Sequence, residues 1–221
     1  MRGLLSLLML APLTVQAQGV PPRDVDLDHV ILYTGRLSPG IAEFARRTGV
    51  TATFGGRHPG RGTENALVSL GDGHYLEILA PVLPQPDSGA QLRPTGWALH
   101  TRALDSVMAR MRAAGFELMG PIPGSRRTAD SALLQWRTAA TAVQGLELAP
   151  FFIEWAAGTP HPSTTSPSGC RLVELTVTTA DTARLHGFFS AAGYRAALRK
   201  GTAAGLQLTL DCPKGRVVFS P

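Results

Sequence analysis

The chain has 221 residues, of which 44% are hydrophobic, and it carries a formal net charge of +5. This length is enough to bury a sizeable core, either in one domain of paired modules or in two small domains. The positive charge comes almost entirely from arginine, with Lys200 and Lys214 the only lysines, and it is scattered along the chain without a basic stripe. We therefore expect no nucleic-acid partner.

Residues 1–17 carry an early arginine, the apolar stretch GLLSLLMLAPL and a small-residue cleavage site that ends at Ala17. This order is typical of a secretory signal peptide, and the apolar stretch is too short to span a bilayer. We expect an exported protein, periplasmic or secreted, that begins near Gln18. No stable membrane anchor is expected after the signal peptide is cleaved.

A first module is predicted at residues 27–81. It begins with the strand-like run LDHVILYT and continues with a helix from Ser38 to Thr48 that stops at Gly49. It ends with a hairpin in which GDGH joins ALVSL to YLEIL. Side chains alternate along the last strand, so Glu77 shares a face with bulky apolar neighbours. A carboxylate in that position needs a cation, a metal or a strong donor, and it therefore marks a candidate site.

The same order of strand, helix and three short strands occurs twice more, at residues 96–156 and 170–221. Helices are expected at about residues 104–114 and 181–191, and the Pro/Gly-rich stretch 157–169 is expected to be a linker. A recurring unit of this kind predicts an α+β fold of βαβββ modules. In this interpretation residues 18–156 form a pair of modules, and the third module follows them.

The two cysteines, Cys170 and Cys212, both lie in the third module. In an oxidising compartment an even number of cysteines favours a disulfide, which would tie the first strand of that module to its last hairpin. Two buried free thiols are the alternative.

Five segments carry a family resemblance: LDHV, GGRHPGRGTENAL, YLEILAP, GWALHT and PFFIEW. Together they resemble the glyoxalase-like domain branch of the vicinal oxygen chelate superfamily, which also includes glyoxalases, bleomycin resistance proteins and dioxygenases. The resemblance covers essentially the whole chain after the predicted signal peptide. It implies that two modules pair into a curved, barrel-like mixed sheet with flanking helices and that a divalent metal lies inside.

The resemblance places the metal ligands at His29, Glu77 and Glu154. One imidazole and two carboxylates suit Zn, Mn, Fe or Ni. The fourth ligand position falls on or near Trp97, which cannot bind a metal, and His100 is expected on the opposite face of that strand. The alternative is that the two glutamates pair with arginines such as Arg57 or Arg137.

Substrate contacts are predicted from the loop after the first helix and from the cleft walls. Four polar residues form the predicted rim, namely Arg57, His58, Thr63 and Asn65, although such a loop can also be held together by its own hydrogen bonds. Strand alternation places Trp97 and Phe152 on the cleft face. Three further histidines, His74, His161 and His186, are assigned to surface or turn positions.

The resemblance implies a metal-dependent lyase or isomerase that acts on a small compound with adjacent oxygens, with Glu77 and Glu154 as catalytic residues. The predicted signal peptide implies that this protein is exported. A second hypothesis is a non-catalytic protein that binds or sequesters a small molecule. A third is a ring-cleaving dioxygenase, which is the least favoured because such a site uses two histidines and one carboxylate around iron.

The third module has Val217 where the first module has Glu77. It therefore lacks a metal ligand, and we expect it to be architectural. It would cover a sheet edge or pair with a second subunit, which predicts a homodimer.

Overall fold

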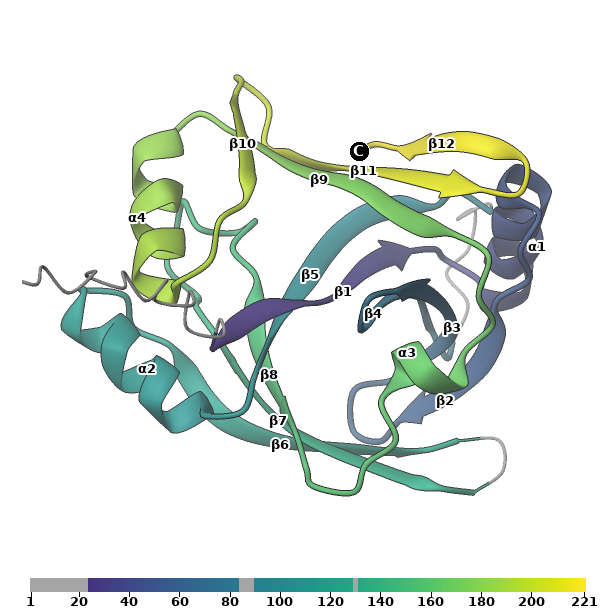
Figure 1. Cartoon of the computed structure of the whole chain (residues 1–221), viewed down its shortest axis with the longest axis horizontal. Coiled ribbons are helices and arrows are strands. Elements are labelled where there is room, and N and C mark those ends of the chain that lie inside the picture. The colour runs from purple at the N-terminus through teal and green to yellow at the C-terminus, as the bar shows by residue number, and fades with distance from the viewer. Residues whose placement is uncertain (1–23, 84–89, 129–130) are drawn as a thin grey trace, which may run out of the picture.

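The structure is a computed structural model that describes residues 24–83, 90–128 and 131–221 (Figure 1). The predicted signal peptide at residues 1–17 lies outside these ranges. Within them, no helix has the length and apolar character needed to cross a membrane.

Each of the three predicted modules folds as strand, helix and three strands, as expected. The first contains β1 (Val25–Tyr33), α1 (Leu37–Thr48), β2 (Thr53–His58), β3 (Thr63–Gly71) and β4 (His74–Pro81). The second contains β5 (Arg93–Thr101), α2 (Leu104–Ala113), β6 (Met119–Arg127), β7 (Leu133–Ala140) and β8 (Phe151–Trp155). The third contains β9 (Arg171–Thr179), α4 (Thr182–Ala192), β10 (Ala197–Lys200), β11 (Gly205–Cys212) and β12 (Gly215–Phe219). The short helix α3 (Pro162–Thr165) lies between the second and third modules.

Local sequence signals account for several element ends. Helix α1 stops at Gly49, which adopts the left-handed conformation that glycine tolerates best. The β3–β4 turn uses Asp72 and Gly73, both with positive φ, as a type I′ hairpin turn requires. The predicted start of α1 is one residue too late, because the helix begins at Leu37, and its N-cap, Arg36, makes no side-chain hydrogen bond.

The first two modules share one eight-stranded sheet with the order β2-β3-β4-β1-β5-β8-β7-β6. Strands β1 and β5 pair antiparallel at its centre, and each pairs on its other side with the last strand of its own module in parallel. The sheet curls into a half-barrel (Figure 1). Its edge strands come together where Arg126 on β6 donates a hydrogen bond to the carbonyl oxygen of Gly55 on β2. Gly56 is needed beside this contact, because a Cβ there would lie closer than 3.0 Å to the Arg127 carbonyl oxygen.

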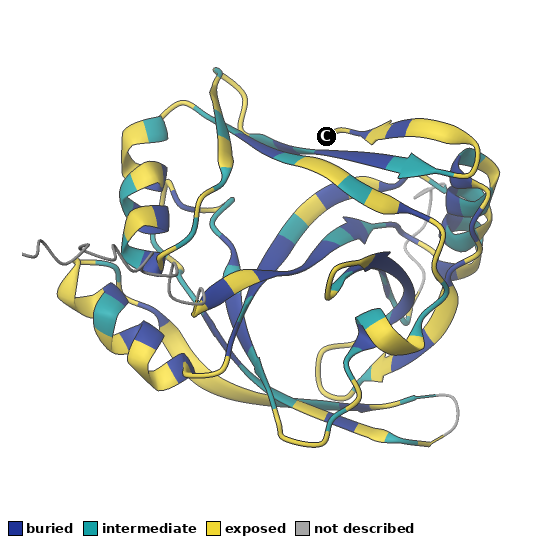
Figure 2. Ribbon diagram, viewed as in Figure 1, coloured by how far each residue is buried: buried dark blue, intermediate teal, exposed yellow. Residues whose placement is uncertain are grey.

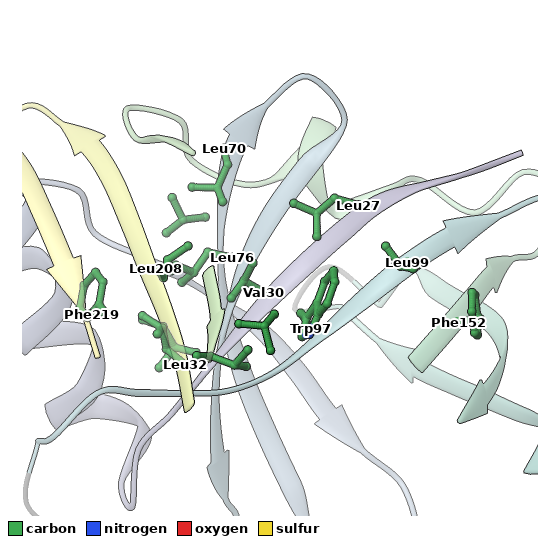
Figure 3. Close-up of a cluster of buried hydrophobic side chains, with 14 of the residues drawn as sticks. Leu27, Val30, Leu32, Leu70, Leu76, Trp97, Leu99, Phe152, Leu208 and Phe219 are labelled. Carbon is green, nitrogen blue, oxygen red and sulfur yellow. The ribbon is translucent and has the colours of Figure 1, made fainter. Parts of the chain in front are cut away.

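The third module forms a separate four-stranded sheet with the order β10-β9-β11-β12. Its apolar side chains join those of the large sheet in one hydrophobic core. Figure 3 shows Leu208 from this module near Leu76 and Val30 from the large sheet, with Phe219 at the far end of the same cluster from Trp97. The module therefore covers a face of the large sheet rather than an edge. Figure 2 shows that the central strands carry many buried residues, whereas the helices have one exposed side.

The predicted disulfide is confirmed. Cys170, immediately before β9, bonds to Cys212 at the end of β11, with a sulfur–sulfur distance of 2.07 Å. The covalent link therefore joins the first strand of the third module to its last hairpin.

Candidate functional site

A cavity of about 210 Å³ lies on the concave side of the curled sheet, opposite the face that the third module covers. It is lined by inward-pointing side chains from β1, β2, β3, β4, β6, β7 and β8, and by Arg61 from the β2–β3 loop. The polar part of the lining comprises His29, His58, Arg61, Thr63, Asn65, Tyr75, Glu77, Arg126 and Thr138. The apolar part comprises Ile31, Leu79, Trp136, Phe151, Ile153 and Trp155.

Strand register decides which side chains reach the cavity. His29 on β1 pairs with Tyr75 on β4, and Ile31 pairs with Glu77, so these four residues share the concave face. The prediction that Glu77 is buried beside bulky neighbours is confirmed, because it is 7% exposed and lines the cavity.

A chain of polar contacts runs from the barrel wall to the cavity. His29 Nδ1 lies 2.6 Å from Asp28 Oδ1, and His29 Nε2 lies 3.6 Å from Glu77 Oε2. Asp28 is fully buried and also accepts hydrogen bonds at Oδ2 from Trp155 Nε1 (3.0 Å) and His161 Nε2 (3.2 Å). Asp28 therefore orients both histidines.

The Asp28 carboxyl group is ionised despite its burial. Burial by itself would raise its pKa, but the hydrogen bonds from His161 and His29 outweigh burial and lower the pKa well below its usual range. The anion in turn raises the pKa of the Tyr75 hydroxyl, although burial is the larger cause of that shift. The Tyr75 ring stacks on the His29 ring, with centroids 4.5 Å apart, and so supports the imidazole from the side.

Glu77 is held by two more predicted residues. Asn65 Nδ2 donates to Glu77 Oε1 at 2.6 Å, and His58 Nε2 lies 3.8 Å from the same oxygen. His58 is fixed in turn by Thr63 Oγ1, 2.9 Å from its Nδ1. Burial lowers the pKa of His58, while the nearby Glu77 charge opposes that shift. His58, Thr63 and Asn65 therefore lie where the sequence analysis placed them.

Glu154 is not in the cavity, contrary to the prediction. It lies on the other face of β8, where its carboxylate forms an ion pair with Arg137 and accepts a hydrogen bond from the backbone N–H of Leu104 at the start of α2. The alternative of a glutamate–arginine pair is thus correct for Glu154.

Trp97 and Phe152 are also on the opposite face from the one predicted. Val30 pairs with Trp97, and Leu99 pairs with Phe152, so both aromatic side chains join the core beneath the third module. Both are almost completely buried, and neither lines the cavity. Their strand neighbours take the inward positions, so it is Phe151 that reaches the cavity.

Arg57 also lies outside the cavity, since its side chain is exposed and pairs with Glu64. His161, expected at a surface or turn position, is the N-cap of the short helix α3, and its partly exposed side chain also contacts Asp28. Arg126 and Trp136 were missed altogether. Both lie in the second module, and only the curl of the sheet brings β6 and β7 to the cavity.

The predicted metal ligands do not assemble. Of the three, His29 and Glu77 are neighbours, whereas Glu154 points to the other side of the sheet and pairs with Arg137. The amide of Asn65 also donates to Glu77 Oε1, so one oxygen of this carboxylate already has a hydrogen-bond partner. Across the ranges that the structure describes, no group of three histidine, cysteine, aspartate or glutamate side chains is arranged to hold a metal ion. The residues present therefore do not fit the implied site.

Paired βαβββ modules around an inner cavity define a protein of the vicinal oxygen chelate superfamily. The sequence model of the glyoxalase-like domain family matches residues 27–193, which is most of the chain. The protein therefore belongs to the glyoxalase-like domain family. Among curated proteins, a search of this sequence finds no match.

Solved structures of low sequence identity match this chain. A hypothetical protein from Staphylococcus aureus is 16% identical, with a TM-score of 0.59, and the match covers 89% of this chain and 85% of that one. A methylmalonyl-CoA epimerase from Mycobacterium tuberculosis is 19% identical, with a TM-score of 0.45, and the match covers 63% of this chain and 94% of that one. A Streptomyces coelicolor methylmalonyl-CoA epimerase variant, in complex with 2-nitronate-propionyl-CoA, is 18% identical, with a TM-score of 0.44 and coverage of 61% and 96%.

Proposed function

We propose that the protein is an isomerase or lyase that moves a proton to or from a carbon atom next to a carbonyl group of a small molecule with adjacent oxygens. The observation that carries this proposal is the position of Glu77, a buried carboxylate that faces the cavity with an oriented histidine beside it. Glutamate and histidine are among the most common general acids and bases in enzymes.

The contact between His29 and Glu77 suits a pair that holds one proton. Because His29 Nδ1 donates to Asp28, Nε2 is the atom that faces Glu77. A hydrogen on Nε2 or on the Glu77 carboxyl group makes this contact attractive, because two lone pairs would otherwise face each other.

In the proposed reaction, Glu77 accepts a proton from the substrate carbon, and the electron pair of the broken C–H bond remains on the substrate as an enolate. His58 and Thr63 lie at the rim of the same cavity and can hydrogen-bond substrate oxygens. The proton then returns from Glu77 to a different atom of the substrate, which is an isomerisation. If a leaving group departs from the enolate instead, the reaction is an elimination.

The test is proton exchange with solvent. The protein is incubated in D₂O with a panel of small 2-oxo acids and 2-hydroxy ketones, and loss of the C–H signal next to the carbonyl is followed by ¹H NMR. Glu77→Gln should slow exchange by about 10²-fold or more. Glu64→Gln is the matched control, because Glu64 lies on the adjacent strand and pairs with the exposed Arg57. Exchange at equal rates in wild type and Glu77→Gln would refute the proposal.

A non-catalytic binding protein is the second candidate, and the incomplete metal ligand set favours it. The same panel distinguishes the two, because a binding protein shifts the ligand signals without exchanging the C–H proton.

Export is part of the proposal. The disulfide supports it, since such bonds persist in oxidising compartments. Expression of the full chain in a bacterial host should yield a periplasmic or secreted product whose first residue, by mass spectrometry, is near Gln18. Gel filtration of that product tests the expected homodimer, and elution as a monomer would rule it out.

A further inference from the structure

Arg126 is the least expected residue of the cavity. It is a cation with only 3% of its surface exposed, and it lines the same space as Glu77 and His58. Its one hydrogen bond in the described part of the chain is donated to the Gly55 carbonyl oxygen. A guanidinium group has five N–H donors, so this bond leaves most of them unused.

Other arginines of this chain have a carboxylate partner. Arg57, Arg137 and Arg171 each form an ion pair with a carboxylate although their side chains are largely exposed. Among the residues that the structure describes, no carboxylate lies within ion-pair distance of Arg126. A buried charge without a partner is costly, so the arrangement is unfavourable unless another anion completes it.

The hydrogen bond to Gly55 gives Arg126 a structural role, because it joins the two edges of the sheet. That role does not require a charge, since a neutral donor can also bond to a carbonyl oxygen. Burial lowers the pKa of Arg126, while Tyr75 and Glu77 oppose that shift. A guanidinium group keeps its proton in proteins, so Arg126 is a cation without a direct counter-ion at the wall of the cavity.

The remaining lining limits what the counter-ion can be. The volume of about 210 Å³ is below the roughly 300–1,000 Å³ that is usual for drug-sized ligands. Trp136, Trp155 and Phe151 supply flat apolar walls. A carboxylate matches one guanidinium group in charge and can accept two parallel hydrogen bonds from it.

We propose that Arg126 binds the carboxylate group of a small acid whose apolar or aromatic body lies against the tryptophans of the cavity. This inference rests on the proposed function, because it describes the substrate of the same cavity. In this arrangement the substrate carboxylate lies at Arg126 on β6, and the reacting carbon points toward Glu77 on β4.

The test compares acids with their neutral esters. Phenylpyruvate, 3-phenylpropanoate and 4-methyl-2-oxopentanoate, each beside its methyl ester, are titrated into the full chain by calorimetry. Wild type should bind at least one acid about tenfold or more tightly than its ester. Arg126→Met should remove that preference, so that the acid and its ester bind with equal affinity. Arg127→Met is the matched control, because Arg127 is exposed and donates to the Ser131 carbonyl oxygen.

Three results would overturn the proposal: no binding of any of the three acids, equal binding of acid and ester by wild type, or an unchanged preference in Arg126→Met. Tighter binding of phenyl phosphate than of the acids would overturn the assignment to a carboxylate.

If Arg126→Met does not fold, Arg126→Lys replaces it, and the expected result is a reduced preference because the two parallel hydrogen bonds are lost. A retained acid preference in Glu77→Gln, with no proton exchange by wild type, would refute the proposed function while supporting the role of Arg126.

Discussion

Removal of the disulfide should destabilise the whole protein. Cys170 and Cys212 are separated by 42 residues in sequence, so their bond closes a loop that contains most of the third module. In the chain-entropy model a loop of this length stabilises the folded state by about 4 kcal/mol at 25 °C. For a chain of this size that loss corresponds to a fall in melting temperature of roughly 8–16 °C.

The whole protein is affected because the third module shares its core with the large sheet. Phe188 and Phe189 of α4 contact Phe152 and Trp97, and Phe219 of β12 contacts Phe44 of α1. We therefore expect the Cys170→Ala, Cys212→Ala variant to unfold in one transition rather than to lose the third module first.

The assay is urea unfolding followed by tryptophan fluorescence and by circular dichroism. Wild type with a thiol reductant is the matched control, and it should unfold at the urea concentration that unfolds the double variant. A loss below about 1 kcal/mol would refute the loop argument, given the range observed for disulfides. Two separate transitions in wild type would refute the shared core.

Four further changes test other parts of the structure. Phe188→Ala, at a fully buried side chain, should cost about 3–5 kcal/mol in urea unfolding. Gly55→Ala should impair proton exchange in the NMR assay, because its Cβ would lie closer than 3.0 Å to Asn65 Oδ1 and displace the amide that holds Glu77. Glu154→Gln should leave binding in the cavity unchanged and cost less than about 1 kcal/mol, since its arginine partner is well exposed. Asp28→Asn should make thermal stability less sensitive to acid. The lowered pKa of Asp28 gives stability that is present above about pH 4 and is lost as the pH falls further.

Each of these expectations has a clear contrary result. A cost below about 1 kcal/mol for Phe188→Ala would mean that the site collapses around the lost ring. Normal exchange in Gly55→Ala would mean that the Asn65 amide does not position Glu77. Impaired binding in Glu154→Gln would contradict the strand register, and an unchanged acid sensitivity in Asp28→Asn would contradict the ionised, hydrogen-bonded aspartate.

The module pattern could be predicted from the sequence because its signals are local. Strand alternation, helical periodicity and glycines such as Gly49 and Gly73 at positions of positive φ depend on neighbouring residues alone. The same locality explains why the concave position of Glu77 and the contacts of His58 with Thr63 were predictable, since all of these residues lie within one module. The cysteine pair was predictable to the extent that the chain offers no second pairing.

Only the tertiary structure decided which face of the second module points inward. Alternation shows that Trp97 and the other residues of its face lie together, but it does not show which side becomes the cavity, and a shift of one residue exchanges the two faces. The pairing of Val30 with Trp97 and of Leu99 with Phe152 settled that choice, and the same alternation along β8 turned Glu154 away from the cavity. Arg126 reached the cavity for a similar reason, because the curl of the sheet brings β6 to β2 across a separation in sequence that no local pattern encodes.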